Sequence, residues 1–412
     1  MASVKPLLFA FTLTVASCAA QTPLNPIPEA VQKACDPNYK PYTGGPITSG
    51  PPMPFSVALC EHGIDTSETS LIAALKNSDP VVRSLAAYQL VLNRKADGIP
   101  GIQAIQNALP SESNARARMG MASALASVGD PLGAKTLVSM CSDASLSLED
   151  TVSVVNQIAI AEYSRPNFIS TGVCADVVLA EFDRASQSYQ RTELVSVLSK
   201  IYKNVPKEKA DRMVTDAQNL LADESPSTRM EAGRALAEMD STASIDLMRN
   251  AIQKEPGSGI RLMLQLQYLT LLPSAIKSMP KAQADLKIVE LQGLLQDKDR
   301  QVRTLASHGL AQVGSTASFE LIRDALLHED DPSLCTGMQR DFLALLPSWY
   351  KDAPKSQTGP IIAEAEHMLA GYLPLVRMDA AHALAQIGSI SSIDSIRAAI
   401  RNEKIDGARV SM

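Results

Sequence analysis

The stretch that decides the fold is RMEAGRAL at residues 229–236, because it recurs twice at a fixed distance. Its copies are RTLASHGL at residues 303–310 and RMDAAHAL at residues 377–384, so each copy begins 74 residues after the previous one. In every copy a small residue follows the opening Arg by three positions and a Leu follows it by seven, which places both on one face of a helix. This pattern predicts helices that stack on one another in an extended array.

Half of this distance, 37 residues, leads to further copies along the chain. One copy opens at Arg340, and three steps back from Arg229 lead to Arg118. A last copy, DPVVRSLAAYQL at residues 79–90, has its Arg at position 83. We therefore expect nine copies of a helix pair, keyed at residues 83, 118, 155, 192, 229, 266, 303, 340 and 377.

An Arg occupies the key position in six of these copies, near the start of the first helix. We predict a structural role, in which each guanidinium hydrogen-bonds the turn of an adjacent copy. The alternative is a row of guanidinium groups that faces an anionic partner. The residues are Arg83, Arg118, Arg229, Arg303, Arg340 and Arg377.

The opening Asp-Pro-x-Val-Arg-x-x-Ala-Ala at residues 79–87 and the Gly-bounded second helices resemble HEAT repeats, in particular the HEAT-like repeats first associated with phycobilisome lyases. The resemblance covers residues 65–402 and implies an all-α fold, an α-α superhelix (HEAT-like solenoid) of about nine helix pairs. It further implies first helices on the convex side and second helices on the concave side, where varied residues would select a protein partner. Gly129, Gly314 and Gly388 are expected to end helices in the left-handed conformation.

The first twenty residues are expected to be an export signal. Lys5 supplies a positive start, residues 7–16 form a short apolar run, and small residues follow. Cleavage before Gln21 would release a free protein, whereas a lipobox reading of the same residues would lipidate Cys18. A Pro-rich arm is expected at residues 21–64 and a C-terminal tail at residues 403–412. We therefore expect an exported bacterial protein, periplasmic or extracellular, and on the second reading a lipoprotein.

Five cysteines remain after either kind of processing. Cys35 and Cys60 are predicted to form a disulfide, because it would close the Pro-rich segment. Cys141 and Cys174 fall in second helices of adjacent copies, where a disulfide and two buried thiols are both open. Cys335, just before a helix, is expected to be the unpaired thiol.

The composition and motifs point to binding rather than catalysis. A net charge of -6 disfavours nucleic acid, and no apolar stretch after the signal is long enough to span a bilayer. We found no nucleophile elbow, phosphate loop or metal motif, so no enzyme activity, cofactor or metal is expected; the alternative is a bilin-lyase-like enzyme or enzyme subunit. His308 and His382 are expected to be tolerant surface positions. Solvated local ion pairs are predicted for Asp246–Arg249, Glu320–Arg323 and Asp394–Arg397.

Overall fold

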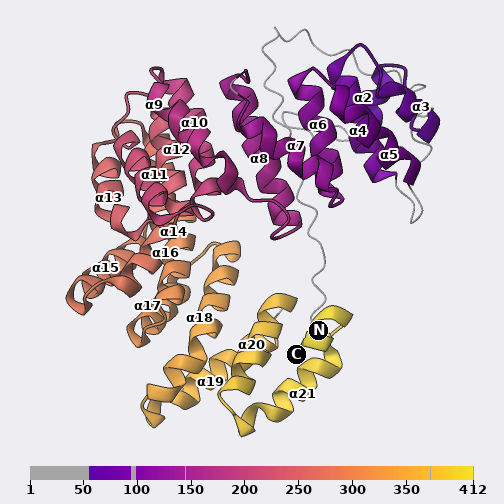
Figure 1. Ribbon diagram of the computed structural model, residues 1–412. Helices are drawn as coiled ribbons and strands as arrows, with labels where there is room; N and C mark the ends of the chain where they lie inside the picture. The colour runs from indigo at the N-terminus through magenta and orange to yellow at the C-terminus, as the bar shows by residue number, and fades with distance from the viewer. Residues whose placement is uncertain (1–54, 94–98, 144, 372, 412) are drawn as a thin grey trace. The chain divides into compact units, whose positions relative to one another are not determined.

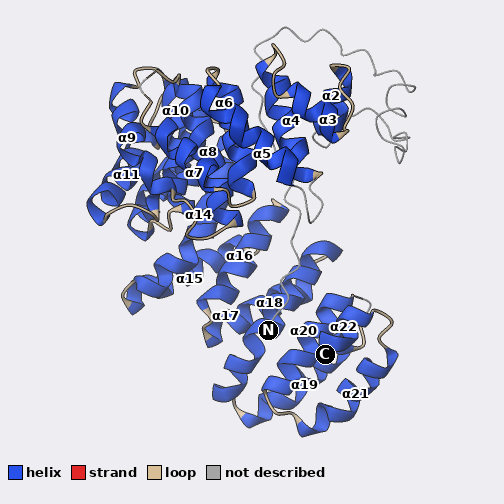
Figure 2. Ribbon diagram, turned by 45° about the vertical axis from the view of Figure 1, so that its right-hand side comes forward, coloured by secondary structure: helices blue, strands red, loops and turns tan. Residues whose placement is uncertain are grey.

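Helices are the only regular elements in the residues that the structure describes (Figure 2). The computed structural model describes residues 55–93, 99–143, 145–371 and 373–411. The predicted export signal at residues 1–20, with Cys18, and most of the predicted arm, with Cys35, lie outside these residues. The predicted all-α fold class is confirmed.

The chain divides into two compact units, and the division falls inside helix α10. Unit 1 contains the residues up to Ala185 together with Lys200–Pro206, and unit 2 contains Ser186–Ser199 and the chain from Lys207 onward. The helices of unit 1 are α2 (Phe55–Glu61), α3 (Glu68–Ala74), α4 (Pro80–Leu92), α5 (Ile99–Ala108), α6 (Ala115–Ser127), α7 (Pro131–Cys141), α8 (Leu148–Ser164) and α9 (Ala175–Arg184), with the 3-10 helices η1 (Leu109–Ser111) and η2 (Thr171–Cys174).

Unit 2 continues the same alternation of first and second helices (Figure 1). Its α-helices are most of α10 (Ser188–Tyr202), then α11 (Lys207–Leu220), α12 (Pro226–Glu238), α13 (Ile245–Lys254), α14 (Ser258–Ser278), α15 (Lys281–Leu294), α16 (Arg300–Val313), α17 (Thr316–His328), α18 (Pro332–Asp352), α19 (Lys355–Leu369), α20 (Pro374–Gln386), α21 (Ile393–Asn402) and α22 (Asp406–Ser411). In the described residues, α4 to α21 form the nine helix pairs that the repeat predicts.

Two further helices lie in segments where none was expected. Helix α2 falls within the expected arm and packs on α4, and its Leu59 side chain is fully buried. Helix α22 falls within the expected tail at residues 403–412. It begins 74 residues after α18 begins at Pro332. Helix α22 is therefore the first helix of a further helix pair and not a separate tail.

The helix boundaries follow the chemistry that the sequence indicated. Asp79 caps α4, since its Oδ1 accepts a hydrogen bond of 2.8 Å from the backbone nitrogen of Val81. The three predicted stop glycines all have left-handed backbones, with φ of 84°, 74° and 66° at Gly129, Gly314 and Gly388. Asp240 takes the same place eleven residues after Arg229, with φ of 51°, a conformation that costs energy in any residue with a side chain.

The repeat in unit 2 is a unit of two unequal helix pairs rather than one of 37 residues. The first helices α12, α16 and α20 have 13, 14 and 13 residues, whereas α14 and α18 have 21 each. Successive first helices begin at residues 226, 258, 300, 332 and 374. Steps of 32 and 42 residues therefore alternate, and only their sum, 74, is constant.

The first helices of unit 2 form one closely packed layer, and the second helices form the other. Helix α12 approaches α14 so closely that a Cβ added at Gly233 would lie 2.6 Å from Leu264. The second helices from α13 to α21 lie on the outer side of the curved stack (Figure 1). In a curved stack, the layer whose helices pack more closely lies on the inside. The first helices therefore line the concave side of unit 2. This arrangement is the reverse of the one that the HEAT resemblance implied.

Candidate interaction surface

The key arginines are engaged within the fold. Arg229 donates through Nε and Nη2 to the carboxylate of Glu255, at 2.7 and 3.0 Å, and through Nη1 to the backbone oxygens of Asp223 and Glu224, at 2.8 and 3.0 Å. The carboxylate of Glu255 in turn accepts from the backbone nitrogen of Gly257 at 3.1 Å. The same kind of arrangement joins Arg83 to Glu112, Arg303 to Glu329 and Arg377 to Glu403.

These four arginines, which we call the arginine ladder, join consecutive turns of their units. The hydrogen bond from Arg229 holds the pKa of Glu255 below its ordinary value, although burial acts in the opposite direction. Only 2% of the Glu255 side chain is exposed, so the carboxylate depends on this partner. The geometry corresponds to the predicted structural role, because the guanidinium donors bond the turns and the four Arg side chains are at most 18% exposed.

Arg118 and Arg340 make different contacts. Arg118 donates through Nη2 to Asp143 at 2.8 Å. Arg340 is half-exposed and donates to Asp379 on α20 at 2.6 Å, without a contact to backbone oxygens. In that helix pair the residue that bonds a backbone oxygen six positions earlier, as the ladder arginines do, is Cys335. Its thiol donates to the backbone oxygen of Glu329 at 3.0 Å. The prediction that placed Arg340 in the ladder is wrong, because it assumed equal steps of 37 residues.

The glutamates of the ladder were not identified from the sequence, although a signal for them was present. Glu255, Glu329 and Glu403 each lie 26 residues after the Arg that they bind. They occur at the end of each second helix, where an acidic residue can also be explained by solvation alone. A search for acids at a constant distance from the key arginines would have identified them.

The two repeated histidines lie on the surface of the first helices. His308 Nδ1 is 3.2 Å from Asp341 Oδ1, and Gln312 lies 3.0 Å from the other ring nitrogen. His382 is paired in the same way with Gln386, at 2.7 Å. Both are exposed, as expected. Within the described residues no three His, Cys, Asp or Glu side chains gather in a way that could hold a metal ion.

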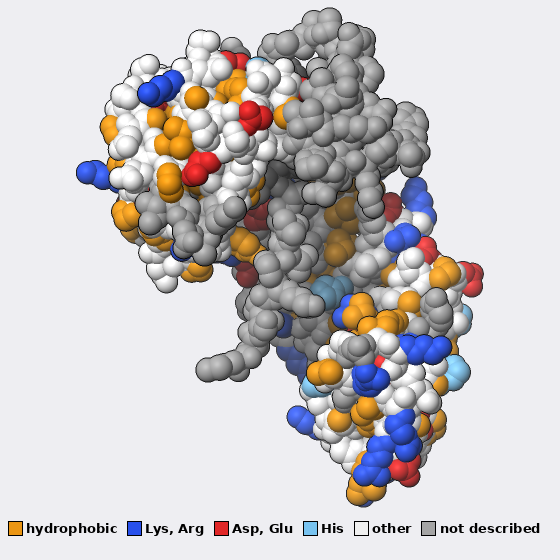
Figure 3. Space-filling model, turned by 90° about the vertical axis from the view of Figure 1, so that its right-hand side faces the viewer, with side chains coloured by type: hydrophobic (Ala, Val, Ile, Leu, Met, Phe, Trp, Pro, Cys, Tyr) orange, Lys and Arg blue, Asp and Glu red, His pale blue; other side chains and the backbone are white. Residues whose placement is uncertain are grey.

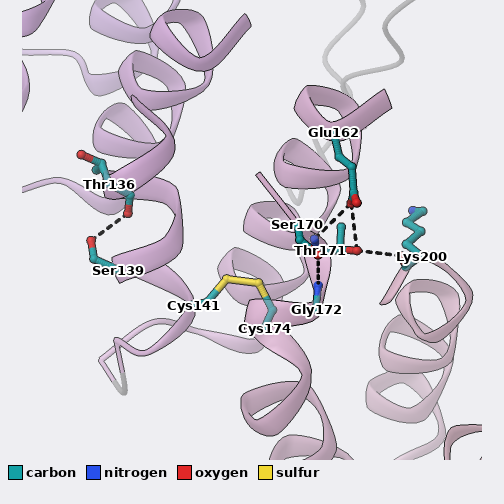
Figure 4. Close-up of a disulfide and its surroundings, with 9 residues drawn as sticks. All are labelled: Thr136, Ser139, Cys141, Glu162, Ser170, Thr171, Gly172, Cys174 and Lys200. Carbon is teal, nitrogen blue, oxygen red and sulfur yellow. Dashed lines mark hydrogen bonds between the residues drawn. A yellow bond between two sulfur atoms is a disulfide. The ribbon is translucent and has the colours of Figure 1, made fainter. Parts of the chain in front are cut away.

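A disulfide joins Cys141 at the end of α7 to Cys174 in η2 (Figure 4). The two Cα atoms are 5.1 Å apart, so the bond links adjacent helix pairs of unit 1. Next to it, the Thr171 hydroxyl donates to the backbone oxygen of Lys200 at 2.8 Å. Cys60 is also disulfide-bonded, whereas its predicted partner Cys35 lies outside the described residues. In the described chain Cys335 is the free cysteine, as expected.

Two of the three local ion pairs predicted in second helices are wrong. Asp394 and Arg397 do pair, at 3.4 Å. Arg323 instead reaches α19 and binds the Glu364 carboxylate with both sides of its guanidinium fork, while Glu320 accepts a hydrogen bond of 2.9 Å from the indole of Trp349. The spacing of the second helices explains this, because a long Arg side chain spans the gap to the next one.

A groove of about 640 Å³ lies between α13 and α15, on the outer layer of unit 2. Two apolar side chains on its α15 wall are strongly exposed, Leu286 at 71% and Val289 at 62%. The amine of Lys287 is held at its floor, and only 8% of that residue is exposed. We call this site the α13–α15 groove; its lining residues are Asp246, Arg249, Met279, Gln283, Leu286, Lys287, Val289 and Glu290.

The apolar wall of the groove and its buried lysine have no equivalent one repeat further along. In the 74-residue register, Leu286 and Val289 correspond to Pro360 and Ala363, and buried Lys287 corresponds to Ile361. The fold thus tolerates small or rigid residues where this helix pair exposes large apolar ones. The enlarged apolar side chains are not required by the packing of the repeat.

Apolar and charged side chains are also mixed elsewhere on the surface. The face in Figure 3 shows hydrophobic, basic and acidic side chains interspersed over the described residues. Among these residues, no helix combines the length and the apolar character needed to cross a bilayer.

The sequence matches no model of a known protein family, and no curated protein sequence matches it. An engineered protein of known crystal structure is 19% identical, with a TM-score of 0.41 over 84% of this chain and 97% of its own. Kap121p bound to Nup53p is 11% identical, with a TM-score of 0.48 over 95% of this chain and 45% of its own. Kap121p bound to Pho4p is 15% identical, with a TM-score of 0.40 over 81% and 39%. The chain thus spans less than half the length of either Kap121p chain.

Proposed function

We propose that this protein is an exported scaffold that binds other proteins, with the α13–α15 groove as its principal docking site. The observation that carries the proposal is the exposure of Leu286 and Val289 where the next repeat has Pro360 and Ala363. Exposed apolar side chains rimmed by charged groups are typical of protein interfaces. Binding, rather than bond chemistry, is the function that such a site supports.

The cysteine chemistry supports export. Disulfides persist in oxidising compartments and are rare in the cytosol. The chain has a disulfide between Cys141 and Cys174, and Cys60 is disulfide-bonded as well. Together with the signal-like residues 1–20, this favours a periplasmic or extracellular location in a bacterium, either as a free protein that begins at Gln21 or as a lipoprotein anchored at Cys18.

Crosslinking in cells that express the full chain, followed by mass spectrometry, tests both parts of this proposal. The expected result is a processed N-terminus in the envelope or the medium, and crosslinks from a partner protein to α13 and α15. Recovery of the chain in the cytosol with residues 1–20 intact would contradict export.

Matched variants make the docking part specific. Val289→Asp places a charge on the wall of the groove, and Ala363→Asp places the same charge at the matched position of the next repeat. Both positions are exposed, so neither charge has to be buried. We expect loss of the crosslinked partner with the first variant alone. Equal recovery of the partner with both variants would contradict docking at this groove.

A further inference from the structure

We propose that the α13–α15 groove binds an acidic segment of the partner protein, in which a carboxylate pairs with Arg249 and neighbouring apolar side chains contact Leu286 and Val289. This inference rests on the proposed docking function and specifies the chemistry of the partner. It is derived from a comparison of two ion pairs that occupy the same place in successive repeats.

The two ion pairs are Arg249 with Glu290 and, 74 residues later, Arg323 with Glu364. Arg323 hydrogen-bonds both oxygens of Glu364, through Nε at 2.9 Å and through Nη2. Arg249 only approaches Glu290, with Nε 3.5 Å from Oε1 and no hydrogen bond between them. In one repeat the guanidinium fork is hydrogen-bonded to the acid, and in the other it makes an ion pair of 3.5 Å without a hydrogen bond.

Two substitutions between the repeats account for this difference. The position of Phe342 is taken by Tyr268, whose hydroxyl donates to Glu290 Oε1 at 2.9 Å. The position of Ile361 is taken by Lys287, whose amine lies 3.4 Å from Glu290 Oε2 and 3.2 Å from the Tyr268 hydroxyl. Phe and Ile have no such donors. Tyr268 and Lys287 therefore hold the Glu290 carboxylate, and its Oε1 atom stays 3.5 Å from Arg249 Nε.

Within the described residues, Arg249 is consequently left with an ion pair but no hydrogen bond to an acid. Asp246, the other acid of the groove, is 85% exposed and lies 3.6 Å from the amine of Lys287, while Glu290 lies 3.4 Å from the same amine and is 22% exposed. Arg249 is 49% exposed at the rim, and within the described residues Glu290 is the one acidic group within 4 Å of its guanidinium. A planar fork of this kind binds a carboxylate with two parallel hydrogen bonds.

The rest of the lining defines what accompanies the carboxylate. Leu286 and Val289 lie one turn apart on α15, and Met279 lies before the start of that helix. Apolar side chains of a partner can cover these residues while an acid beside them contacts Arg249. The fitting occupant is a protein segment with an Asp or Glu among apolar residues.

The test is selection of random dodecapeptides by phage display on the immobilised full-length chain, followed by fluorescence anisotropy with the enriched peptides. We expect enrichment of peptides that carry an acid between apolar residues. Arg249→Ala should weaken their binding by about tenfold or more, as expected for a charge-assisted hydrogen-bonded pair. Replacing the peptide acid by its amide should weaken binding similarly, and combining both changes should cost little more than either alone.

Arg323→Ala is the matched control, since its guanidinium is occupied by Glu364. The Arg323→Ala variant should bind the peptides within about twofold of the unmodified chain, because the Arg323 side chain is not expected to contact them. Enriched peptides without acids, equal losses for the two variants, or no loss with Arg249→Ala would each overturn the inference. If no peptide is enriched, the acidic-segment inference is overturned, but the scaffold proposal stands as long as Val289→Asp still abolishes crosslinking of the partner. Failure of both experiments would overturn both proposals.

Discussion

Replacing Arg229 by Ala should destabilise unit 2 far more than replacing Arg340 by Ala, although both arginines occupy key positions of the same sequence repeat. Arg229→Ala removes two hydrogen bonds to Glu255 and two to backbone oxygens. It leaves a carboxylate that is only 2% exposed with one backbone donor, from Gly257. Loss of one partner of a buried ion pair costs about 3–5 kcal/mol of unfolding free energy.

Arg340→Ala removes a single contact to Asp379, in which the two side chains are 49% and 36% exposed. An exposed pair of this kind contributes about 0–1 kcal/mol. Urea unfolding followed by far-UV circular dichroism measures the difference, and hydrogen exchange of peptides from α12 to α14 locates it. Equal destabilisation by the two variants, or a cost below about 1 kcal/mol for Arg229→Ala, would refute the assignment of the ladder.

Three further outcomes are expected. Asp240→Gly should raise the free energy of unfolding by up to about 1 kcal/mol, because φ is 51° there, whereas Asp240→Ala should lower it; thermal unfolding checks the sign. Cys141→Ser should lower stability by about 2–4 kcal/mol through loss of the bond to Cys174, and a reductant should then have less effect on the variant than on the unmodified chain. Urea midpoints should fall progressively as the pH drops below about 5, because the lowered pKa of Glu255 in the folded state means that its contribution to stability is lost when the carboxylate is protonated; Glu255→Gln should reduce this dependence.

The helical fold could be predicted because its signals are local and repeated. A Leu and a small residue at fixed distances from an Arg define a helix face, and Gly314 and Gly388 mark where helices end. The same spacing in three copies makes coincidence a poor explanation. The nine helix pairs follow from these signals without any knowledge of contacts.

The unequal halves of the repeat could not be predicted in the same way. The apolar runs of α14 and α18 align with those of the preceding first helices when the chain is shifted by 37 residues. Each of these two helices nevertheless begins earlier than that shift implies. Arg261 and Cys335 therefore take the ladder position in their helix pairs. The position is defined by backbone oxygens six residues earlier in the chain. Helix periodicity carries no information about that contact.

The groove depends on contacts between residues far apart in the sequence. Local spacing paired Asp246 with Arg249, because both lie on one helix face. In the structure each turns to a group on α15, 41 residues onward, namely Lys287 for the acid and Glu290 for the Arg. The register of the repeat does show that Leu286 and Val289 replace Pro and Ala, but only their exposure identifies them as surface residues.

Site-specific photocrosslinking from the α13–α15 groove tests the central claim most directly. A benzophenone side chain is introduced at position 289 and, in a separate variant, at the matched position 363, and each full-length chain is illuminated in cells. We predict a discrete crosslinked partner protein from position 289 and none from position 363. Equal crosslinking from both positions, or none from position 289, would contradict docking at this groove.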